Sequence, residues 1–425
     1  MMNKNLIYNI FMKKYIYLCG PTVYDKVHIG NMRPIVTFDL ILRGYKYLYP
    51  NQYVFIHNIT DIDDKIINQA QKLNILESEV SLKYYEFYIK MLEEYNVQTI
   101  DKMPKVTEHI DEIANFIQNI LNNNNGYIVN KSIYFDTSKF PQYGSVSNID
   151  LKNLQNKKIH EQKNDFDFVL WKNKNEGMTW KTIIGNGRPG WHTECAFFVN
   201  HYTKGNSLEI HGGGIDLKFP HHENENIQYI AANNKPITNK WLHVGIININ
   251  KQKMSKSLGN IIKADQFLSL YPNGADLFRL LILTSNINIE IEINDIVINP
   301  LIKKINQLDK IINYLKLNEE QLEISFSKNN ETKIYNDIAQ ELIKGSFSQI
   351  NKNLNKLIKQ FNQNKNIIDA LEIYFYIKFL GFNLANKTID QSLIDLYHEY
   401  KSLLSKKEYD KSDEIRKILL KHNLI

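Results

Sequence analysis

The chain has 425 residues, is 43% hydrophobic and 23% charged, and carries a formal net charge of +6. This composition excludes disordered, fibrous and collagen-like proteins, and the length allows roughly two to four domains. The modest basic excess fits a polyanionic partner but is equally typical of scattered surface lysines. No apolar run approaches the roughly 20 residues of a membrane-spanning helix. With Cys19 and Cys195 as its two cysteines, the chain has no disulfide framework, which favours a reduced, cytoplasmic setting with an organellar matrix as the alternative.

The first part of the chain alternates short apolar runs with helical patterns. The apolar run Tyr15–Leu18 ends at Gly-Pro and predicts a buried strand, which the helical pattern Ile35–Tyr49 follows. Tyr53–His57 predicts a second strand, and the carboxylates between Asn58 and Lys65 indicate a helix start, where the helix dipole favours them. Strand, helix, strand and helix in this order predict an α/β fold with a doubly wound parallel sheet of Rossmann type.

An insertion is predicted inside this sheet. A long helical pattern covers Glu79–Asn122, and the Asn/Lys-rich stretch after it carries one strand signal, at Ser132–Asp136. We interpret residues 92–164 as a connective insertion between the two halves of the sheet. We expect helices after His192 and His221, and later strands of the sheet at Asp165–Trp171, Leu208–His211 and Trp241–Ile247.

The last third of the chain is predicted to be helical. After a β-branched patch at Ile287–Ile293, nearly every segment from Ile302 onward has helical periodicity, which predicts a separate C-terminal all-α domain. The expected helices in this part of the chain are Ala264–Leu270, Ala275–Thr284, Ile302–Leu315, Glu331–Asn362, Ile367–Ala385, Gln391–Leu404 and Lys407–His422.

Two stretches carry the pattern of a nucleotide site. The run Cys19-Gly-Pro-Thr-Val-Tyr-Asp-Lys-Val-His-Ile-Gly-Asn31 joins the first strand to the first helix, where backbone N–H groups and the imidazole of His28 can meet a phosphate. Lys253-Met-Ser-Lys-Ser-Leu-Gly-Asn260 is a Ser/Gly-rich loop with two cations. Alone, such a loop is more often a solvated turn, but paired with the first run it suits closure over a triphosphate.

Cys19 opens the first of these stretches, and Cys195 ends another motif, Gly190-Trp-His-Thr-Glu-Cys195. In a reduced setting, cysteines inside motifs point to metal binding or catalysis. His221 and Glu225, four residues apart after Phe-Pro, share a helix face. Two thiolates, an imidazole and a carboxylate suit zinc. The residues alone leave two alternatives open: His222 as the ligating imidazole, or two buried cysteines beside an unrelated His/Glu pair.

Taken together, the motifs resemble a known family. His28-Ile-Gly-Asn31 and Lys253-Met-Ser-Lys-Ser257 resemble the paired signatures of class I aminoacyl-tRNA synthetases. The run from Cys19 to Asp25, with Gly190-Trp-His-Thr-Glu-Cys195 and the stretch from His211 to Glu225, narrows the resemblance to the cysteinyl-tRNA synthetase family. It is strong from Tyr15 to Asn260 and weaker in the C-terminal helices.

This resemblance implies a zinc-dependent ligase that activates L-cysteine with ATP and Mg²⁺ to cysteinyl-adenylate. The cysteinyl group then moves to the 3′-terminal adenosine of tRNA(Cys), and we expect a monomer without a membrane partner. Zinc would hold the substrate thiolate and so separate cysteine from serine, which a hydrophobic pocket does poorly. The implied zinc ligands are Cys19, Cys195, His221 and Glu225.

Further roles around the ATP and cysteine sites follow from the same resemblance. The implied catalytic residues, which stabilise the pyrophosphate leaving group, are His28, Asn31, Lys253 and Lys256. The implied nucleotide contacts are Gly30, Asp216 and Lys256, and the implied cysteine pocket comprises Gly20, Thr60, Trp191 and His211. Asn31 stands where the class signature usually has histidine, and an uncharged donor there predicts altered nucleotide contacts rather than lost activity.

The expected domain boundaries follow from these motifs. Residues 1–91 and 165–250 are expected to form the two halves of the catalytic domain, the second with the zinc site, separated by the insertion at 92–164. Residues 251–301 would hold the KMSKS loop and a stem-contact region, and residues 302–425 a helical domain that binds the tRNA anticodon. Two other functions share most of these features: a mycothiol-pathway cysteine ligase with an amino-sugar acceptor, and a non-catalytic tRNA-binding paralogue.

Overall fold

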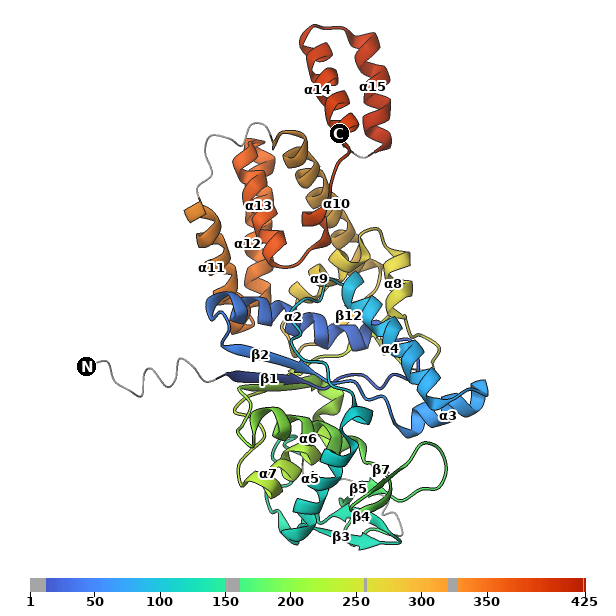
Figure 1. Ribbon diagram of the computed structural model, residues 1–425. Helices are drawn as coiled ribbons and strands as arrows, with labels where there is room; N and C mark the ends of the chain where they lie inside the picture. Colours follow the sequence, from blue (N-terminus) through green and yellow to red (C-terminus); the bar gives the residue numbers. More distant parts are fainter. Residues whose placement is uncertain (1–12, 150, 152–160, 256–257, 320–327, 423) are drawn as a thin grey trace, which may run out of the picture. The chain divides into compact units, whose positions relative to one another are not determined.

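The computed structural model describes residues 13–149, 151, 161–255, 258–319, 328–422 and 424–425 (Figure 1). The chain divides into two compact units. The first unit comprises Met1–Phe38, Tyr49–Glu93 and Gln98–Ile246, and the second comprises Asp39–Leu48, Glu94–Val97 and Ile247–Ile425. Among the described residues, no helix is both long and apolar enough to cross a membrane.

A four-stranded parallel sheet forms the centre of the first unit. Its strands are β1 (Lys14–Leu18), β2 (Tyr53–His57), β8 (Ile210–Gly214) and β9 (Trp241–Val244), in the order β2-β1-β8-β9. Leu18 pairs with His57 on one side and with Gly212 on the other. Because all four strands run the same way, their carboxyl ends meet at one edge, where the loop after β1 begins with Cys19. The predicted parallel sheet and its first two strands are confirmed.

Helices of the first unit pack against this sheet and against one another. Figure 1 shows α5 (Ile110–Asn122), α6 (Trp191–Thr203) and α7 (Glu223–Asn233) grouped on the same side of β1 and β2. Helix α5 buries isoleucines at positions 110, 113, 117 and 120, a helical spacing that directs one apolar stripe into the core. These helices share one hydrophobic cluster with residues of β1 and β2, so the sheet edge and the starts of α6 and α7 are held together.

The prediction of one continuous helix over Glu79–Asn122 is wrong, because the structure has two helices separated by a non-helical segment. Helix α4 covers Glu77–Glu94, α5 begins at Ile110, and the chain between them runs beside β2. There the His57 amide donates to Lys102 O at 2.9 Å, and the Ile59 amide donates to Pro104 O at 2.8 Å. Proline and strand-like pairing at this point are incompatible with a continuous helix. The preceding helix, α3, covers Asp64–Leu73 and is capped by the Asp63 carboxylate.

A second, antiparallel sheet lies in the first unit. Its strands are β3 (Gly126–Val129), β4 (Ser132–Phe135), β5 (Phe168–Lys172), β6 (Trp180–Thr182) and β7 (Gly185–Pro189), in the order β3-β4-β5-β7-β6. The prediction that the parallel sheet resumes at Asp165–Trp171 is therefore wrong, because β5 pairs antiparallel with β4 and β7. An apolar run indicates a buried strand but does not determine which sheet the strand joins.

The second unit is mainly helical. Its described residues form the short strands β10 (Ile247–Ile249), β11 (Gln252–Lys253) and β12 (Ile291–Ile293). They also form the helices α8 (Ala264–Leu270), α9 (Gly274–Leu283), α10 (Asp295–Leu317), α11 (Lys328–Lys344), α12 (Phe347–Asn364), α13 (Ile367–Phe379), α14 (Gln391–Ser405) and α15 (Tyr409–Lys421). The predicted helical C-terminal region is confirmed. The single helix expected at Glu331–Asn362 is two helices, because Gly345 adopts a φ of +73° and ends α11.

One buried arginine ties several parts of the second unit together. The Arg279 guanidinium on α9 is fully buried and donates to Asp39 Oδ2 at 2.8 Å, Tyr95 O at 2.8 Å and Leu380 O at 3.1 Å. Asp39 lies in helix α2 (Ile29–Leu48), whose first turn follows His28. Breaking such a buried, hydrogen-bonded pair is costly, since it leaves an uncompensated charge, so Arg279 fixes the second half of α2.

Candidate metal centre and active site

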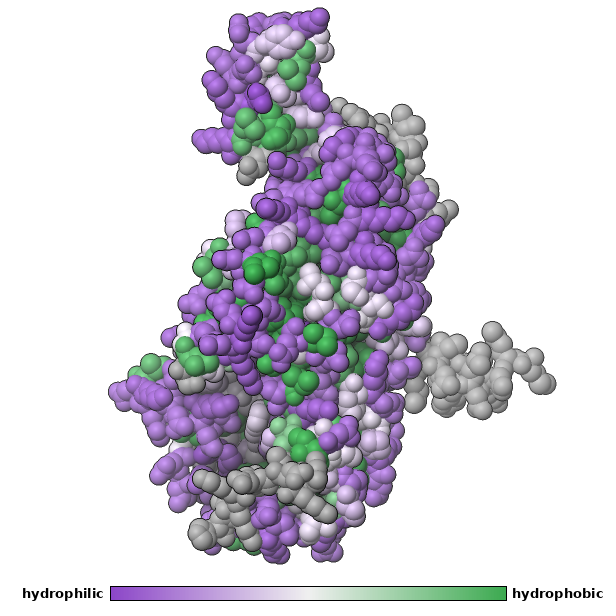
Figure 2. Space-filling model, turned by 180° about the vertical axis from the view of Figure 1, so that it is seen from behind, coloured by the Kyte–Doolittle hydropathy of each residue, from purple (hydrophilic) through white to green (hydrophobic). Residues whose placement is uncertain are grey.

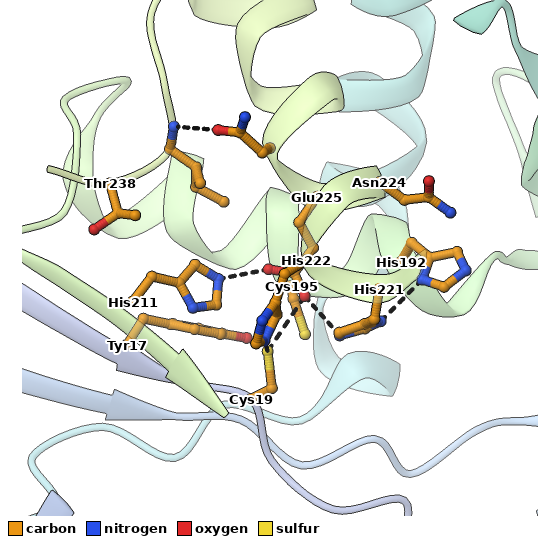
Figure 3. Close-up of polar contacts among 12 residues, drawn as sticks. Tyr17, Cys19, His192, Cys195, His211, His221, His222, Asn224, Glu225 and Thr238 are labelled. Carbon is orange, nitrogen blue, oxygen red and sulfur yellow. Dashed lines mark hydrogen bonds and ion pairs between the residues drawn. The ribbon is translucent and has the colours of Figure 1, made fainter. Parts of the chain in front are cut away.

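Four donor groups from separate parts of the chain converge at the edge of the parallel sheet (Figure 3). The sulfurs of Cys19 and Cys195, a ring nitrogen of His221 and a carboxylate oxygen of Glu225 all lie within 4.8 Å of one another. Cys19 follows β1 and Cys195 lies in α6. His221 lies in the short helical turn Lys218–His222, and Glu225 lies in the first turn of α7. The structure thus brings together the four residues that the resemblance implied as ligands, in a group that could hold a metal ion.

Glu225 lies at the centre of this group and is fully buried. Its Oε1 is 2.6 Å from His221 Nε2 and 3.2 Å from Cys19 Sγ, and its Oε2 is 2.5 Å from His211 Nε2. Burial opposes ionisation of Glu225, but the charges of His221 and His211 outweigh it and hold its pKa well below the usual value. Burial likewise opposes the charged form of His221, yet Glu225 raises its pKa to about 10. A metal ion can take the place of the proton that this buried pair holds.

The pKa values of the two thiols are shifted in opposite directions. Cys195 is 2% exposed, and although burial raises the pKa of its thiol, hydrogen bonds from Cys19 and His221 lower it to about 6. Burial and the neighbouring Cys195 raise the pKa of Cys19 well above its ordinary value. The pair therefore offers one thiolate near neutral pH, and the thiolate is the form that ligates metals.

His222 belongs to a second possible donor group, together with Cys19 and His211. Its Nε2 is 3.5 Å from Cys19 Sγ, and its Nδ1 is 2.9 Å from His243 Nε2. Burial lowers the pKa of His222 well below the ordinary value, so the ring is neutral and able to ligate. The structure separates the two neighbouring imidazoles: His221 faces Glu225, whereas His222 faces Cys19 and His243.

Aromatic rings and a second imidazole orient His221. Trp191 stacks on it with ring centroids 4.3 Å apart, and His192 Nδ1 lies 2.9 Å from His221 Nδ1. Because Nδ1 is engaged there, Nε2 is the nitrogen left to face Glu225, as expected for a ligand held by an outer partner. Burial lowers the pKa of His192 to about 3, so its ring is neutral.

The predicted cysteine-pocket residues lie close to this cluster. The Gly20 amide donates to Asn58 Oδ1 at 2.8 Å, and a Cβ at Gly20 would lie only 1.5 Å from Asn58 O. Buried Thr60 donates to Glu194 Oε2 at 2.9 Å, and Glu194 directly precedes Cys195. His211 lies in β8 and Trp191 starts α6, so the pocket residues border the same sheet edge as the metal-ligand candidates.

The predicted nucleotide residues are distributed over both units. His28 precedes α2, Gly30 and Asn31 lie in its first turn, and Asn31 Oδ1 accepts from the His28 amide at 3.1 Å. Asp216 is exposed in the short turn Ile215–Leu217. Lys253 is exposed at the end of β11 in the second unit. Lys256 lies outside the described residues.

Sequence reasoning missed several residues that touch the cluster. They are Tyr17, Asn58, His192, Trp241 and His243. His192 adjoins the predicted Trp191, and Asn58 opens the motif that contains Thr60, so adjacency to motif residues was the available signal. Trp241 and His243 had no comparable signal, since only the pairing of β9 with β8 brings them beside His211 and His222.

The chain is similar to proteins of one enzyme class. The sequence model of the tRNA synthetases class I (C) catalytic domain matches residues 10–303. A cysteine–tRNA ligase of Malacoplasma penetrans is 42% identical, over 96% of this chain and 95% of that protein. A cysteine–tRNA ligase of Mycoplasmopsis pulmonis is 39% identical, over 96% of this chain and 65% of that longer protein. The solved methionyl-tRNA synthetase of Mycobacterium tuberculosis, in complex with methionyl-adenylate, aligns with a TM-score of 0.60 at 11% identity, over 90% of this chain and 91% of the other.

At 11% identity the likeness to the methionyl enzyme shows the fold alone. That fold, with its parallel sheet and helical C-terminal region, is the fold of class I aminoacyl-tRNA synthetases, which confirms the predicted fold class. The chain itself belongs to the cysteine–tRNA ligase family, as the matched catalytic domain and the near full-length relatives show. It is accordingly an ATP-dependent aminoacyl-tRNA ligase with amino acid, ATP and tRNA as substrates.

Proposed function

We propose that this chain activates L-cysteine with ATP to cysteinyl-adenylate and transfers the cysteinyl group to the 3′-terminal adenosine of tRNA(Cys). The observation that carries the proposal is the cluster of Cys19, Cys195, His221 and Glu225 within 4.8 Å. Cys19 starts the same loop that ends at His28 and the first turn of α2. A substrate sulfur bound at the cluster would therefore lie at one end of this loop. The other end, at the start of α2, is suited to bind a phosphate of ATP.

The donor set fits zinc. The four donor atoms lie within 4.8 Å of one another, close enough to surround a single ion. Two sulfurs, one imidazole nitrogen and one carboxylate oxygen are all ordinary zinc donors. When bound, zinc would accept the sulfur of cysteine as a thiolate and reject the serine hydroxyl, a distinction that pocket size alone makes poorly.

The protein's own groups would orient the rest of the amino acid. Gly20 keeps the loop in contact with Asn58, where any side chain would collide. Thr60 is fixed by its hydrogen bond to Glu194, and Trp191 holds the ring of His221 by stacking. His211 engages Glu225 and so holds the carboxylate in place. Each role leaves the ligating atoms preorganised before the substrate arrives.

Around ATP, the chain would bind phosphate and neutralise charge on the departing pyrophosphate. His28 and the backbone at Gly30 would donate hydrogen bonds, and Lys253 and Lys256 would supply positive charge, with Mg²⁺ accompanying the nucleotide. The side-chain oxygen of Asn31 accepts a hydrogen bond from the His28 amide. The NH₂ group of the same side chain would serve as a neutral donor to the nucleotide. Asp216, exposed after the glycines of β8, is assigned to the adenosine side.

The helical part of the second unit is proposed to contact tRNA. A cavity of about 570 Å³ is lined by Lys303, Lys310, Lys365, Tyr314 and Phe361 among others. Cations beside aromatic rings suit RNA phosphates and unstacked bases. Figure 2 shows a largely hydrophilic face, with hydrophobic residues gathered at the foot of the α14–α15 pair.

A cytoplasmic location is part of the proposal, supported by the two free cysteines.

The decisive experiment is cysteine-dependent ATP–pyrophosphate exchange, followed by acylation with labelled cysteine. We expect exchange with cysteine but not with serine, and label on tRNA(Cys) in the second step. Label that appears on an amino sugar and not on tRNA would reject the proposed acceptor. Absence of exchange in zinc-loaded protein would reject the activity itself.

A further inference from the structure

Asn58 connects the two cysteines of the cluster through one buried amide. It follows β2 and has no exposed surface. Its Oδ1 accepts from the Gly20 amide and from the Tyr17 hydroxyl, each at 2.8 Å, and lies 3.8 Å from Cys195 Sγ. One oxygen thus touches the residue after Cys19, a residue of the strand before it, and Cys195 itself.

The orientation of this amide is fixed by its partners. Nδ2 of Asn58 donates to Thr60 Oγ1 at 3.4 Å, and Thr60 in turn donates to Glu194 at 2.9 Å. A flipped amide would turn its NH₂ group toward the backbone N–H of Gly20, which can only donate. Oδ1 therefore remains directed at Gly20, Tyr17 and Cys195, and all three contacts depend on this one orientation.

Tyr17 extends this support to the other side of the cluster. Its ring is fully buried and meets His211 edge-on, with centroids 5.2 Å apart. His211 contacts Glu225 at 2.5 Å. The Tyr17 hydroxyl is therefore hydrogen-bonded to Asn58, and the Tyr17 ring packs against His211, which in turn contacts Glu225. Buried polar networks of this kind specify one arrangement of the groups they join.

We propose that Tyr17 and Asn58 are positioning residues that fix the sulfurs of Cys19 and Cys195 and thereby set the affinity for cysteine. The inference rests on the proposed function, because it takes the cluster as the place where the substrate sulfur binds. Neither residue touches the substrate; each acts through the loop at Gly20 and through Cys195. Ligating groups must be held within about 0.5 Å of the productive geometry, so loss of one support is expected to weaken substrate binding before it slows chemistry.

The primary test is Tyr17→Phe, which removes the hydroxyl and leaves the ring. Tyr229→Phe is the matched control, since Tyr229 is also fully buried in the first unit and donates its hydroxyl to Asn206 O at 2.6 Å, away from both cysteines. We expect the KM for cysteine in pyrophosphate exchange to rise about fivefold or more in Tyr17→Phe. The KM for ATP and kcat should stay within about twofold, and the control should change neither KM.

A spectroscopic measurement accompanies the kinetics. With cobalt(II) in place of zinc, the thiolate charge-transfer band should shift in Tyr17→Phe and remain unchanged in Tyr229→Phe. Asn58→Leu, which keeps the side-chain shape without the acceptor, should shift it further; if that variant does not fold, Tyr17→Phe decides alone. Equal spectra and equal KM values for cysteine in Tyr17→Phe and Tyr229→Phe would overturn the inference. Absent exchange in the unsubstituted chain would instead reject the proposed function.

Discussion

Gly20→Ala tests whether the loop after β1 must press against Asn58 for the cluster to form. A Cβ on Gly20 would lie 1.5 Å from Asn58 O and 2.6 Å from the carbonyl carbon, and these are backbone atoms that cannot rotate away. Side-chain Cβ atoms essentially never approach closer than 3.0 Å. Relief of the clash thus requires the loop to move by about 1.5 Å, which carries the adjoining Cys19 with it.

The expected losses follow from that displacement. Cys19 Sγ is 3.2 Å from Glu225 Oε1, and a move of this size away from it would open the contact. A misplacement of about 1 Å at an active site costs on the order of 100-fold in rate, so kcat/KM for cysteine should fall about 100-fold or more. Overpacking of this kind also costs about 1–3 kcal/mol of stability.

The assay combines metal analysis with pyrophosphate exchange and thermal unfolding. Gly185→Ala is the control, because a Cβ there meets no atom within 4 Å although its φ of +109° makes alanine strained. The control should lose some stability but keep its metal and its KM for cysteine. If Gly20→Ala retained full zinc content and an unchanged KM for cysteine, the proposed dependence of the cluster on this close approach would be refuted.

Three other predictions concern single side chains. Cys195→Ser should weaken zinc retention against a chelator and cysteine-over-serine selection together, and full metal occupancy in this variant would contradict the ligand set. Lys256→Ala should slow adenylate formation about 100-fold or more without loss of metal, as single-turnover kinetics would show; an unchanged rate would remove this lysine from the mechanism. Burial lowers the pKa of Lys304 from 10.5 to about 8, so the folded chain binds fewer protons than the unfolded chain between these values, and this residue's contribution to stability rises with pH across that window. Lys304→Met should accordingly raise the unfolding midpoint most below pH about 8, with a gain that shrinks toward pH about 10; a constant gain would refute the assignment.

The elements that local patterns specify were predictable from the sequence. The strands Tyr15–Leu18 and Tyr53–His57 have apolar runs of strand length with clear ends, and the structure has them at Lys14–Leu18 and Tyr53–His57. The helix predicted at Ala264–Leu270 has those same bounds in the structure. Such segments need no distant partner to be recognised, because periodicity and turn residues act within a few positions.

The errors arise where a distant partner or one residue's backbone decides. The strand Phe168–Lys172 reads as a buried run in either sheet, and only its pairing with β4 and β7 assigns it to the antiparallel one. The apolar periodicity around Gly345 predicted one continuous helix. In the structure α11 ends before Gly345, because glycine tolerates the left-handed backbone found there.

The candidate site divides in the same way. Motif residues named the four possible ligands, whereas the spacing of His221 and His222 to Glu225 left either imidazole open. The structure distinguishes them through tertiary neighbours, with His221 2.6 Å from Glu225 and His222 held by His243. The support from Tyr17 and Asn58 depends on adjacent strands and has no signature in the order of residues.

Zinc-edge X-ray absorption of the purified chain, recorded before and after addition of cysteine, tests the central claim most directly. The four clustered side chains include two sulfurs, so we predict one bound zinc with two sulfur ligands in the free protein and three in the presence of cysteine. Absence of zinc, or a sulfur number that cysteine leaves unchanged, would contradict the account.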